Sequence, residues 1–155
     1  MLARVWSAAI AGIDAIKVGV EVDVSGGLPK IIVVGLPDVA IQESRERVKA
    51  ALKNANFAFP VRKIVINLTP ADLRKEGPCF DLPISVGILA ASEQVDPQLL
   101  GDYLFFGEVS LDGTLRAVSG VLPIAAAASK MGIAGLILPL GNAQEAAVVN
   151  DIKVY

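Results

Sequence analysis

Hydrophobic and polar residues alternate along the first part of the chain. Lys17, Glu21 and Asp23 fall on one face of a predicted strand, and a row of valines falls on the other. This period of two is typical of a half-buried β-strand. We expect three such strands to pair as an antiparallel sheet. The predicted strands are residues 7–12, 15–24 and 30–34.

The hydrophobic period then becomes helical. Asp38 can cap a helix that ends near Asn54, because its carboxylate can accept hydrogen bonds from free first-turn amides. Asp81 is the candidate cap of a second helix, whose residues are apolar nearly all round and therefore belong in the core. Asp112-Gly113 is a strong hairpin signal. The other predicted elements are strands at 63–68, 104–108, 115–118, 134–138 and 152–155, and helices at 121–131 and 142–149.

This order of elements predicts an α+β fold with a mixed, mainly antiparallel sheet and packed helices. The 155 residues and 54% hydrophobic content are expected to form a single domain, residues 1–155, with a real core. No apolar run reaches the roughly 18–20 residues that cross a bilayer, so no membrane contact is expected. One cysteine excludes an internal disulfide, which fits a reducing, cytoplasmic location.

Positive charge is concentrated in residues 45–75, although the net charge of the chain is −2. Such a basic region could contact phosphate groups or an acidic partner, or it could simply be a solvated surface. Three of its residues recur every fourth position of the predicted helix, and two precede the second helix. The candidate nucleic-acid or partner contacts are Arg45, Lys49, Lys53, Arg74 and Lys75.

Cys79 is the one candidate nucleophile. It follows Gly77-Pro78 and precedes a helix, where free amides and the helix dipole lower the pKa of a thiol. The chain has no histidine, so a Cys-His pair is excluded. There is also no phosphate-binding glycine motif and no cluster of metal ligands, so no cofactor or metal site is predicted. The alternative for Cys79 is a small buried core residue.

Four sequence motifs support a family resemblance. They are GLPDVAIQESRERVK from Gly35, NLTPADLRKEG from Asn67, FDLPI from Phe80 and GEVSLDGTLR from Gly107. Together they resemble the N-terminal domain of ComM/YifB-type magnesium-chelatase-like AAA+ ATPases over nearly the whole chain. The resemblance implies a fold like the Lon protease domain and the second domain of ribosomal protein S5. It also implies that an ATPase module, using ATP and magnesium, follows Tyr155 and assembles with sister subunits, as a hexamer.

A more distant resemblance to Lon-type peptidases bears on Cys79. The stretch KEGPC matches the family's Lys-Asp-Gly-Pro-Ser, so Cys79 stands where that serine would, as a vestigial candidate. Leu122 falls at the position of the partner lysine, and Lys130 is the only nearby alternative. The resemblance therefore implies a non-catalytic accessory domain that supports ring assembly and DNA binding during branch migration in natural transformation. The alternatives are a degenerate Cys/Lys peptidase and a stand-alone nucleic-acid-binding module.

Overall fold

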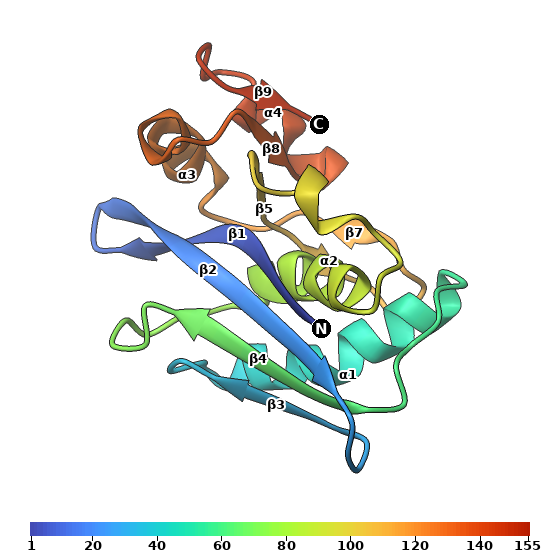
Figure 1. The fold of residues 1–155 in the computed structure, drawn as a ribbon. Helices are drawn as coiled ribbons and strands as arrows, with labels where there is room; N and C mark the ends of the chain where they lie inside the picture. Colours follow the sequence, from blue (N-terminus) through green and yellow to red (C-terminus); the bar gives the residue numbers. More distant parts are fainter.

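The computed structural model describes residues 1–155. Its main element is a seven-stranded mixed sheet (Figure 1). The strand order is β3-β4-β2-β1-β5-β8-β9. β2 pairs antiparallel with β1 and β4, and the other neighbours in this sheet pair parallel. The predicted α+β class with a mixed sheet is thus confirmed. The strands are β1 (Leu2–Ala11), β2 (Asp14–Ser25), β3 (Lys30–Val34), β4 (Lys63–Thr69), β5 (Tyr103–Phe105), β8 (Gly135–Ile137) and β9 (Lys153–Val154).

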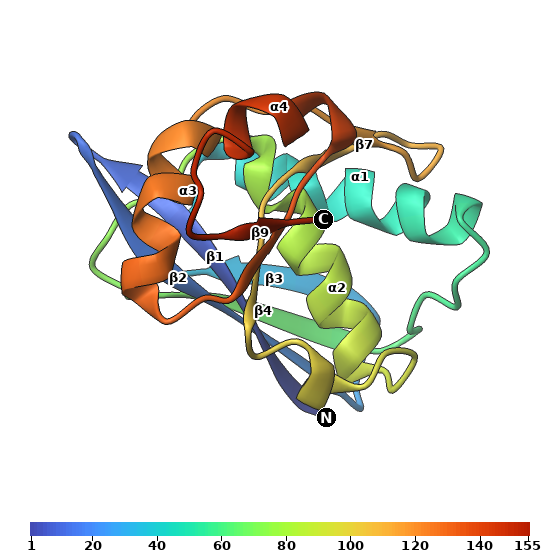
Figure 2. The same ribbon diagram turned by 90° about the horizontal axis from the view of Figure 1, so that it is seen from above.

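The helices and a two-stranded hairpin complete the fold. The core helix α2 packs across β1 and β2, and α1 lies beside it on the same face of the sheet (Figure 2). The helices are α1 (Val39–Asn54), α2 (Asp81–Ala91), α3 (Val121–Ala128) and α4 (Ala143–Ala146), and the hairpin strands are β6 (Glu108–Val109) and β7 (Leu115–Arg116). Short 3-10 turns lie at Pro78–Phe80, Pro97–Leu99, Ser129–Met131 and Leu140–Asn142.

The predicted antiparallel pairing of the first three strands is wrong for the third. β3 pairs parallel with β4, and Lys30 lies opposite Lys63. The reason is that β1 and β4 already occupy the two edges of β2. β3 therefore adds to the outer edge of β4, and α1 forms the crossover that a parallel pair requires.

The predicted cap at Asp38 is confirmed, and the predicted hairpin at Asp112-Gly113 is confirmed with shorter strands. Asp38 caps α1, since the Ile41 N–H donates to Asp38 Oδ1 at 2.9 Å. A hairpin does enclose Asp112-Gly113, but its strands are only two residues each, and β5 belongs to the main sheet instead. The carboxylate of Asp112 accepts from the backbone N–H and the hydroxyl of Thr114, which stabilises the turn.

Asp81 does not cap α2, and this prediction is wrong. Asp81 is the first helical residue and is fully buried. Its carboxylate accepts from Arg47 Nε at 2.8 Å and Arg47 Nη2 at 3.1 Å, from the Val109 N–H at 3.2 Å and from the Ser44 hydroxyl. The hydrogen bond to Asp81 raises the pKa of Arg47. One carboxylate therefore joins α1, α2 and β6.

Lys75 forms a second buried polar anchor. Its side chain is fully buried, and Nζ donates to the carbonyls of Gly35 at 2.8 Å, Leu68 at 2.9 Å and Pro70. Burial lowers the pKa of Lys75, an effect that the charge of Asp72 opposes. The ammonium thereby ties the ends of β3 and β4 to the loop that leads into α2.

The anchoring role of Asp81 predicts a large loss of stability on truncation. Asp81→Ala leaves the guanidinium of Arg47 and the N–H of Val109 without their partner. We expect the free energy of unfolding to fall by about 3 kcal/mol, at the low end of the range for breaking a buried ion pair, because Arg47 keeps some access to water. Denaturant midpoints measure this. Glu43→Ala removes the exposed partner of the same arginine and should change stability by less than about 1 kcal/mol. Equal effects of the two variants would contradict the anchor.

Lys75 gives a matched prediction. Lys75→Met keeps the length of the side chain but leaves three carbonyls without a donor. We expect a loss of about 3 kcal/mol, since each unpaired buried polar group costs about 1–3 kcal/mol and removal of the buried charge offsets part of the sum. Lys130→Met, at an exposed position, should stay within about 0.5 kcal/mol of the wild type. Thermal or denaturant unfolding measures the change. A Lys75→Met protein as stable as the wild type would show that the three carbonyl contacts of Lys75 do not stabilise the fold.

Candidate nucleic-acid groove and a cysteine pocket

Basic side chains gather in one surface groove, here called the basic groove. It has a volume of about 480 Å³ and lies between α1, the start of β3 and the segment 59–62. Glu46 is its one acidic lining residue. Its basic lining residues are Lys30, Arg45, Lys49, Lys53 and Arg62.

None of these five basic side chains forms an ion pair. Arg45 is oriented by backbone carbonyls instead, donating to Gln42 O at 2.9 Å and to Ile31 O at 3.4 Å. Lys49 Nζ lies 6.0 Å from the ring centroid of Phe59, a weak cation–π contact at an exposed position. The groove therefore carries an excess of positive charge, since Glu46 is its one acidic residue, and it faces solvent.

The five residues predicted from sequence to contact a nucleic acid or partner do not all lie together in the structure. Arg45, Lys49 and Lys53 share the basic groove, as the spacing of four residues indicated. Arg74 lies elsewhere, with its side chain exposed and paired with Glu76 at 3.3 Å. Lys75 is buried and bonded to backbone carbonyls, so the prediction of a surface contact for Lys75 is wrong.

Sequence reasoning missed two members of the groove. Arg62 belongs to the basic region 45–75 but follows α1 by several residues, so helical spacing could not connect it to the row. Lys30 begins β3, and its place beside α1 depends on the parallel pairing that brings Lys30 opposite Lys63. Only the sheet order reveals that both belong with the helix.

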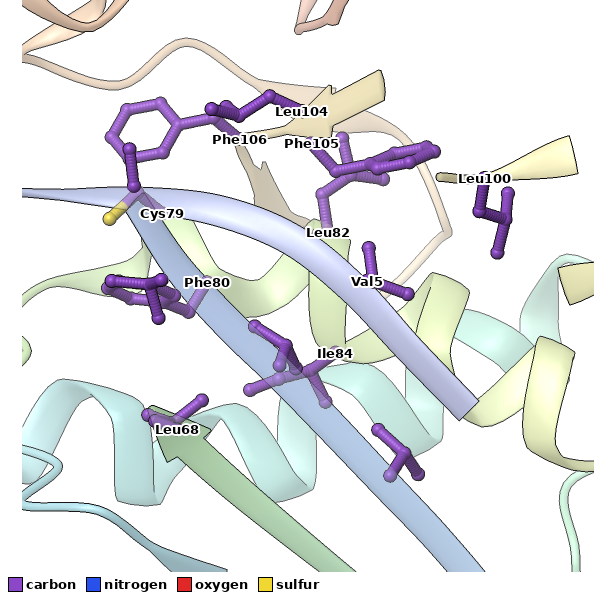
Figure 3. Close-up of a cluster of buried hydrophobic side chains, with 14 of the residues drawn as sticks. Val5, Leu68, Cys79, Phe80, Leu82, Ile84, Leu100, Leu104, Phe105 and Phe106 are labelled. Carbon is purple, nitrogen blue, oxygen red and sulfur yellow. The ribbon is translucent and has the colours of Figure 1, made fainter. Parts of the chain in front are cut away.

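Cys79 lies in a second pocket, here called the cysteine pocket, with a volume of about 620 Å³. The side chain lies between Phe80 and Phe106 in the view of Figure 3. Its Sγ lies 3.6 Å from the carbonyl of Glu76. Burial raises the pKa of the Cys79 thiol to about 12, and the nearby carboxylates of Asp81 and Asp38 add to the effect. The predicted lowering of this pKa by the helix N-terminus is wrong, because desolvation outweighs the dipole.

No lysine lines the cysteine pocket. Leu122, at the position of the expected dyad lysine, is 45% exposed on α3 and does not line the cysteine pocket. Lys130 lines a different pocket, near the β1–β2 turn. Arg74 is the one cation of the cysteine pocket, and a guanidinium cannot act as a base at neutral pH. The cysteine pocket thus holds a thiol with a raised pKa and neither of the lysines that the Lon pattern would use.

Two further classes of feature are absent from residues 1–155. No three His, Cys, Asp or Glu side chains come together where they could hold a metal ion. None of the helices is both long enough and apolar enough to cross a membrane.

The sequence matches the protein family described as subunit ChlI of Mg-chelatase over residues 20–142. The chain belongs to this family. This ChlI-family chain is 47% identical over 154 residues to the competence protein ComM of Haemophilus influenzae. It is 42% identical over 149 residues to the protein YifB of Escherichia coli. These two alignments cover 99% and 96% of the chain, which confirms the resemblance to ComM/YifB-type N-terminal domains.

The ChlI-family chain spans about 30% of the length of the curated relatives that it matches most fully. It is also 31% identical to Lon protease 2 of Thermus thermophilus over 130 residues, which cover 79% of this chain and 16% of that protein. This weaker similarity agrees with the Lon-like fold that the motifs implied.

The raised pKa of Cys79 predicts an unreactive thiol. At pH 8 we expect iodoacetamide to alkylate the folded protein at least about a hundredfold more slowly than the unfolded chain, whose thiol has a pKa of about 8.5. Because the unfolded thiol loses its proton first, the free energy of unfolding should also fall as the pH rises from about 8.5 towards 12. Mass spectrometry follows the single cysteine directly, with guanidinium-unfolded protein as the control. Equal alkylation rates would show that the thiol is accessible and ionisable.

Proposed function

We propose that this chain is a non-catalytic accessory domain of a magnesium-chelatase-like AAA+ ATPase, and that its basic groove binds DNA through the phosphate backbone. The single observation that carries the proposal is the groove itself, in which five unpaired basic side chains face solvent. A surface of this kind attracts a polyanion, and the binding releases counterions. Contacts with phosphates position a nucleic acid without reading its sequence.

The geometry of α1 suits this role. Arg45, Lys49 and Lys53 are four residues apart, so their Cα atoms succeed one another by about 6 Å along the helix axis. This regular row can follow successive phosphates of one strand. Like charges four residues apart oppose helix formation slightly, so the row costs some helix stability. Phe59 alone is a poor stacking platform for bases, which favours contact with the backbone over recognition of bases.

The wider role rests on the relatives. They are about three times as long as this chain, and one bears the name of a competence protein. We propose that the ATP- and magnesium-using module, a hexameric ring and a function in DNA branch migration during natural transformation belong to the longer protein, which acts in the cytoplasm. The accessory domain would support assembly of this ring and hold DNA near it. One domain alone would bind weakly, with a Kd of about 10⁻⁴–10⁻⁶ M, and several domains in a ring would bind more tightly through avidity.

Catalytic inertness is part of the proposal. The protonated thiol of Cys79 and the leucine at position 122 support it, because a cysteine nucleophile needs a thiolate or a neighbouring base. A residual Cys/Lys peptidase would require Lys130 to reach the cysteine pocket, yet Lys130 lines another pocket.

The proposal predicts salt-dependent DNA binding that is weakened when the charge of the groove is reversed. We expect fluorescence anisotropy with labelled single- and double-stranded oligonucleotides to show binding at low salt and a steep fall of affinity as salt rises. Lys49→Glu with Lys53→Glu should weaken binding and lower the slope of log K against log salt. The slope should fall by about 0.7–0.9 for each phosphate that the variant no longer neutralises.

The matched control is Lys130→Glu with Lys153→Glu, which makes the same change of net charge at two exposed lysines outside the groove. This control should keep most of the affinity and the salt slope. Absence of binding at low salt, or the same weakening in both double variants, would refute the groove as a DNA site. The assembly role would then be the better account of the domain.

A further inference from the structure

The β1 strand has an unpaired edge inside the cysteine pocket. β1 runs from Leu2 to Ala11 and pairs with β2 along this whole length. On its other side, β1 pairs with β5 only where Trp6 lies opposite Leu104. No strand pairs with this second side between Ser7 and Ala11. Unpaired strand edges are templates for an added strand.

The hydrogen-bond pattern shows which peptide groups face this edge. Met1 and Val24 exchange both backbone hydrogen bonds, so they form a hydrogen-bonded pair of the antiparallel ladder. Such pairs recur at every second residue, which places Ala9 among those bonded to β2. The peptide groups of Ala8 and Ile10 therefore point away from β2, and both residues line the cysteine pocket. Ala8 is fully buried whereas Ile10 is exposed, so Ile10 is the accessible part of this edge.

The course of the chain after β5 opens the space beside this edge. The Phe106 N–H donates to the carbonyl of Ile137 at 3.2 Å, and the Gly107 N–H donates to the carbonyl of Cys79 at 2.8 Å. Alternate residues of β5 face β1 and β8, so the Phe106 N–H continues the ladder to β8. Gly107 is the next residue that could have donated to β1, and its N–H bonds to Cys79 instead. The resulting gap is the cysteine pocket, whose 620 Å³ lies within the range of about 300–1,000 Å³ that is usual for binding pockets.

The lining of the pocket indicates what kind of side chains would fit. Three carboxylates line it against the single guanidinium of Arg74. Glu76 pairs with Arg74, and Asp38 accepts from the N–H groups of Ile41 and Gly77. Glu108 adds a further negative charge to the wall. Most of the remaining lining is small or apolar, including Ala9 and the aromatic ring of Phe106. A ligand that complements these walls carries positive charge and compact apolar groups.

We propose that the cysteine pocket binds an extended, basic polypeptide segment, which adds to the sheet as a strand along the free edge of β1. The backbone of the segment would bond with the peptide group of Ile10. Alternate side chains would lie against the apolar wall, and a lysine or arginine would meet the carboxylates. This is recognition by strand addition, in which main-chain hydrogen bonds supply affinity and side-chain pockets supply specificity. Cys79 contributes only packing surface, and no covalent step is involved.

This site is independent of the basic groove, because the two pockets share no lining residue. A basic peptide would also be repelled by the groove. Binding of such a peptide should therefore be unchanged in Lys49→Glu with Lys53→Glu, so failure of one proposal leaves the other standing.

The experiment uses a fluorescein-labelled hexapeptide of alternating valine and lysine as the probe. We expect saturable binding by fluorescence anisotropy and slower hydrogen exchange of the Ile10 amide when the peptide is bound. Two control peptides separate the contributions of backbone and charge. A peptide N-methylated at alternate residues lacks the backbone donors of one edge, and a valine-glutamate peptide reverses the charge. Both should bind at least about tenfold more weakly.

A pair of variants tests the edge itself. Ile10→Pro removes the outward N–H without removing a donor to β2, whereas Ile10→Thr keeps this N–H and a branched side chain. Proline is tolerated at such an edge position. We expect Ile10→Pro to bind the probe about twofold to tenfold more weakly than Ile10→Thr, as removal of one hydrogen bond implies. If Ile10→Pro fails to fold, binding of the N-methylated peptide and the exchange rate of the Ile10 amide in the wild type still test the proposal.

Three results would overturn the proposal. They are no saturable binding at millimolar peptide, equal binding of the N-methylated peptide, and an Ile10 amide whose exchange does not change when the probe is bound.

Discussion

The buried ammonium of Lys75 is the interaction on which the functional surfaces depend. It bonds to carbonyls at the ends of β3 and β4, and the backbone of Lys75 bonds with Leu36 and Asp38 at the entrance to α1. Asp38 in turn caps α1 and accepts from the N–H of Gly77 at 2.9 Å. One cation therefore sets both the start of the helix that carries the basic groove and the loop that forms a wall of the cysteine pocket.

The cationic residues have two different roles. Lys75 and Arg47 are held by oxygen atoms of the protein, and their charges join elements of the fold. Arg45, Lys49 and Lys53 have no carboxylate partner, so their charge remains available to a ligand. Arg47 lies between Arg45 and Lys49 in the sequence, because one face of α1 packs on α2 while the other faces solvent.

Burial also decides the chemistry of Cys79. A helix N-terminus favours a thiolate, but that preference is small beside the cost of placing a charge among aromatic rings and near two carboxylates. Cys79 lines a cavity between β1 and the start of α2. Its walls present the outward peptide group of Ile10 and an excess of acidic side chains.

The elements that rest on local chemistry could be predicted from the sequence. The alternation in β2, the capping by Asp38, the apolar core helix and the row of Arg45, Lys49 and Lys53 all depend on residues within a few positions of one another. Tertiary structure decided the rest, because it depends on contacts between distant segments. These include the parallel partner of β3, the burial of Lys75, the turning of Asp81 towards Arg47 and the gap beside Ile10. A charged residue looks the same in sequence whether it faces water or carbonyl oxygens, and only the packing of the surrounding chain decides which solvation it receives.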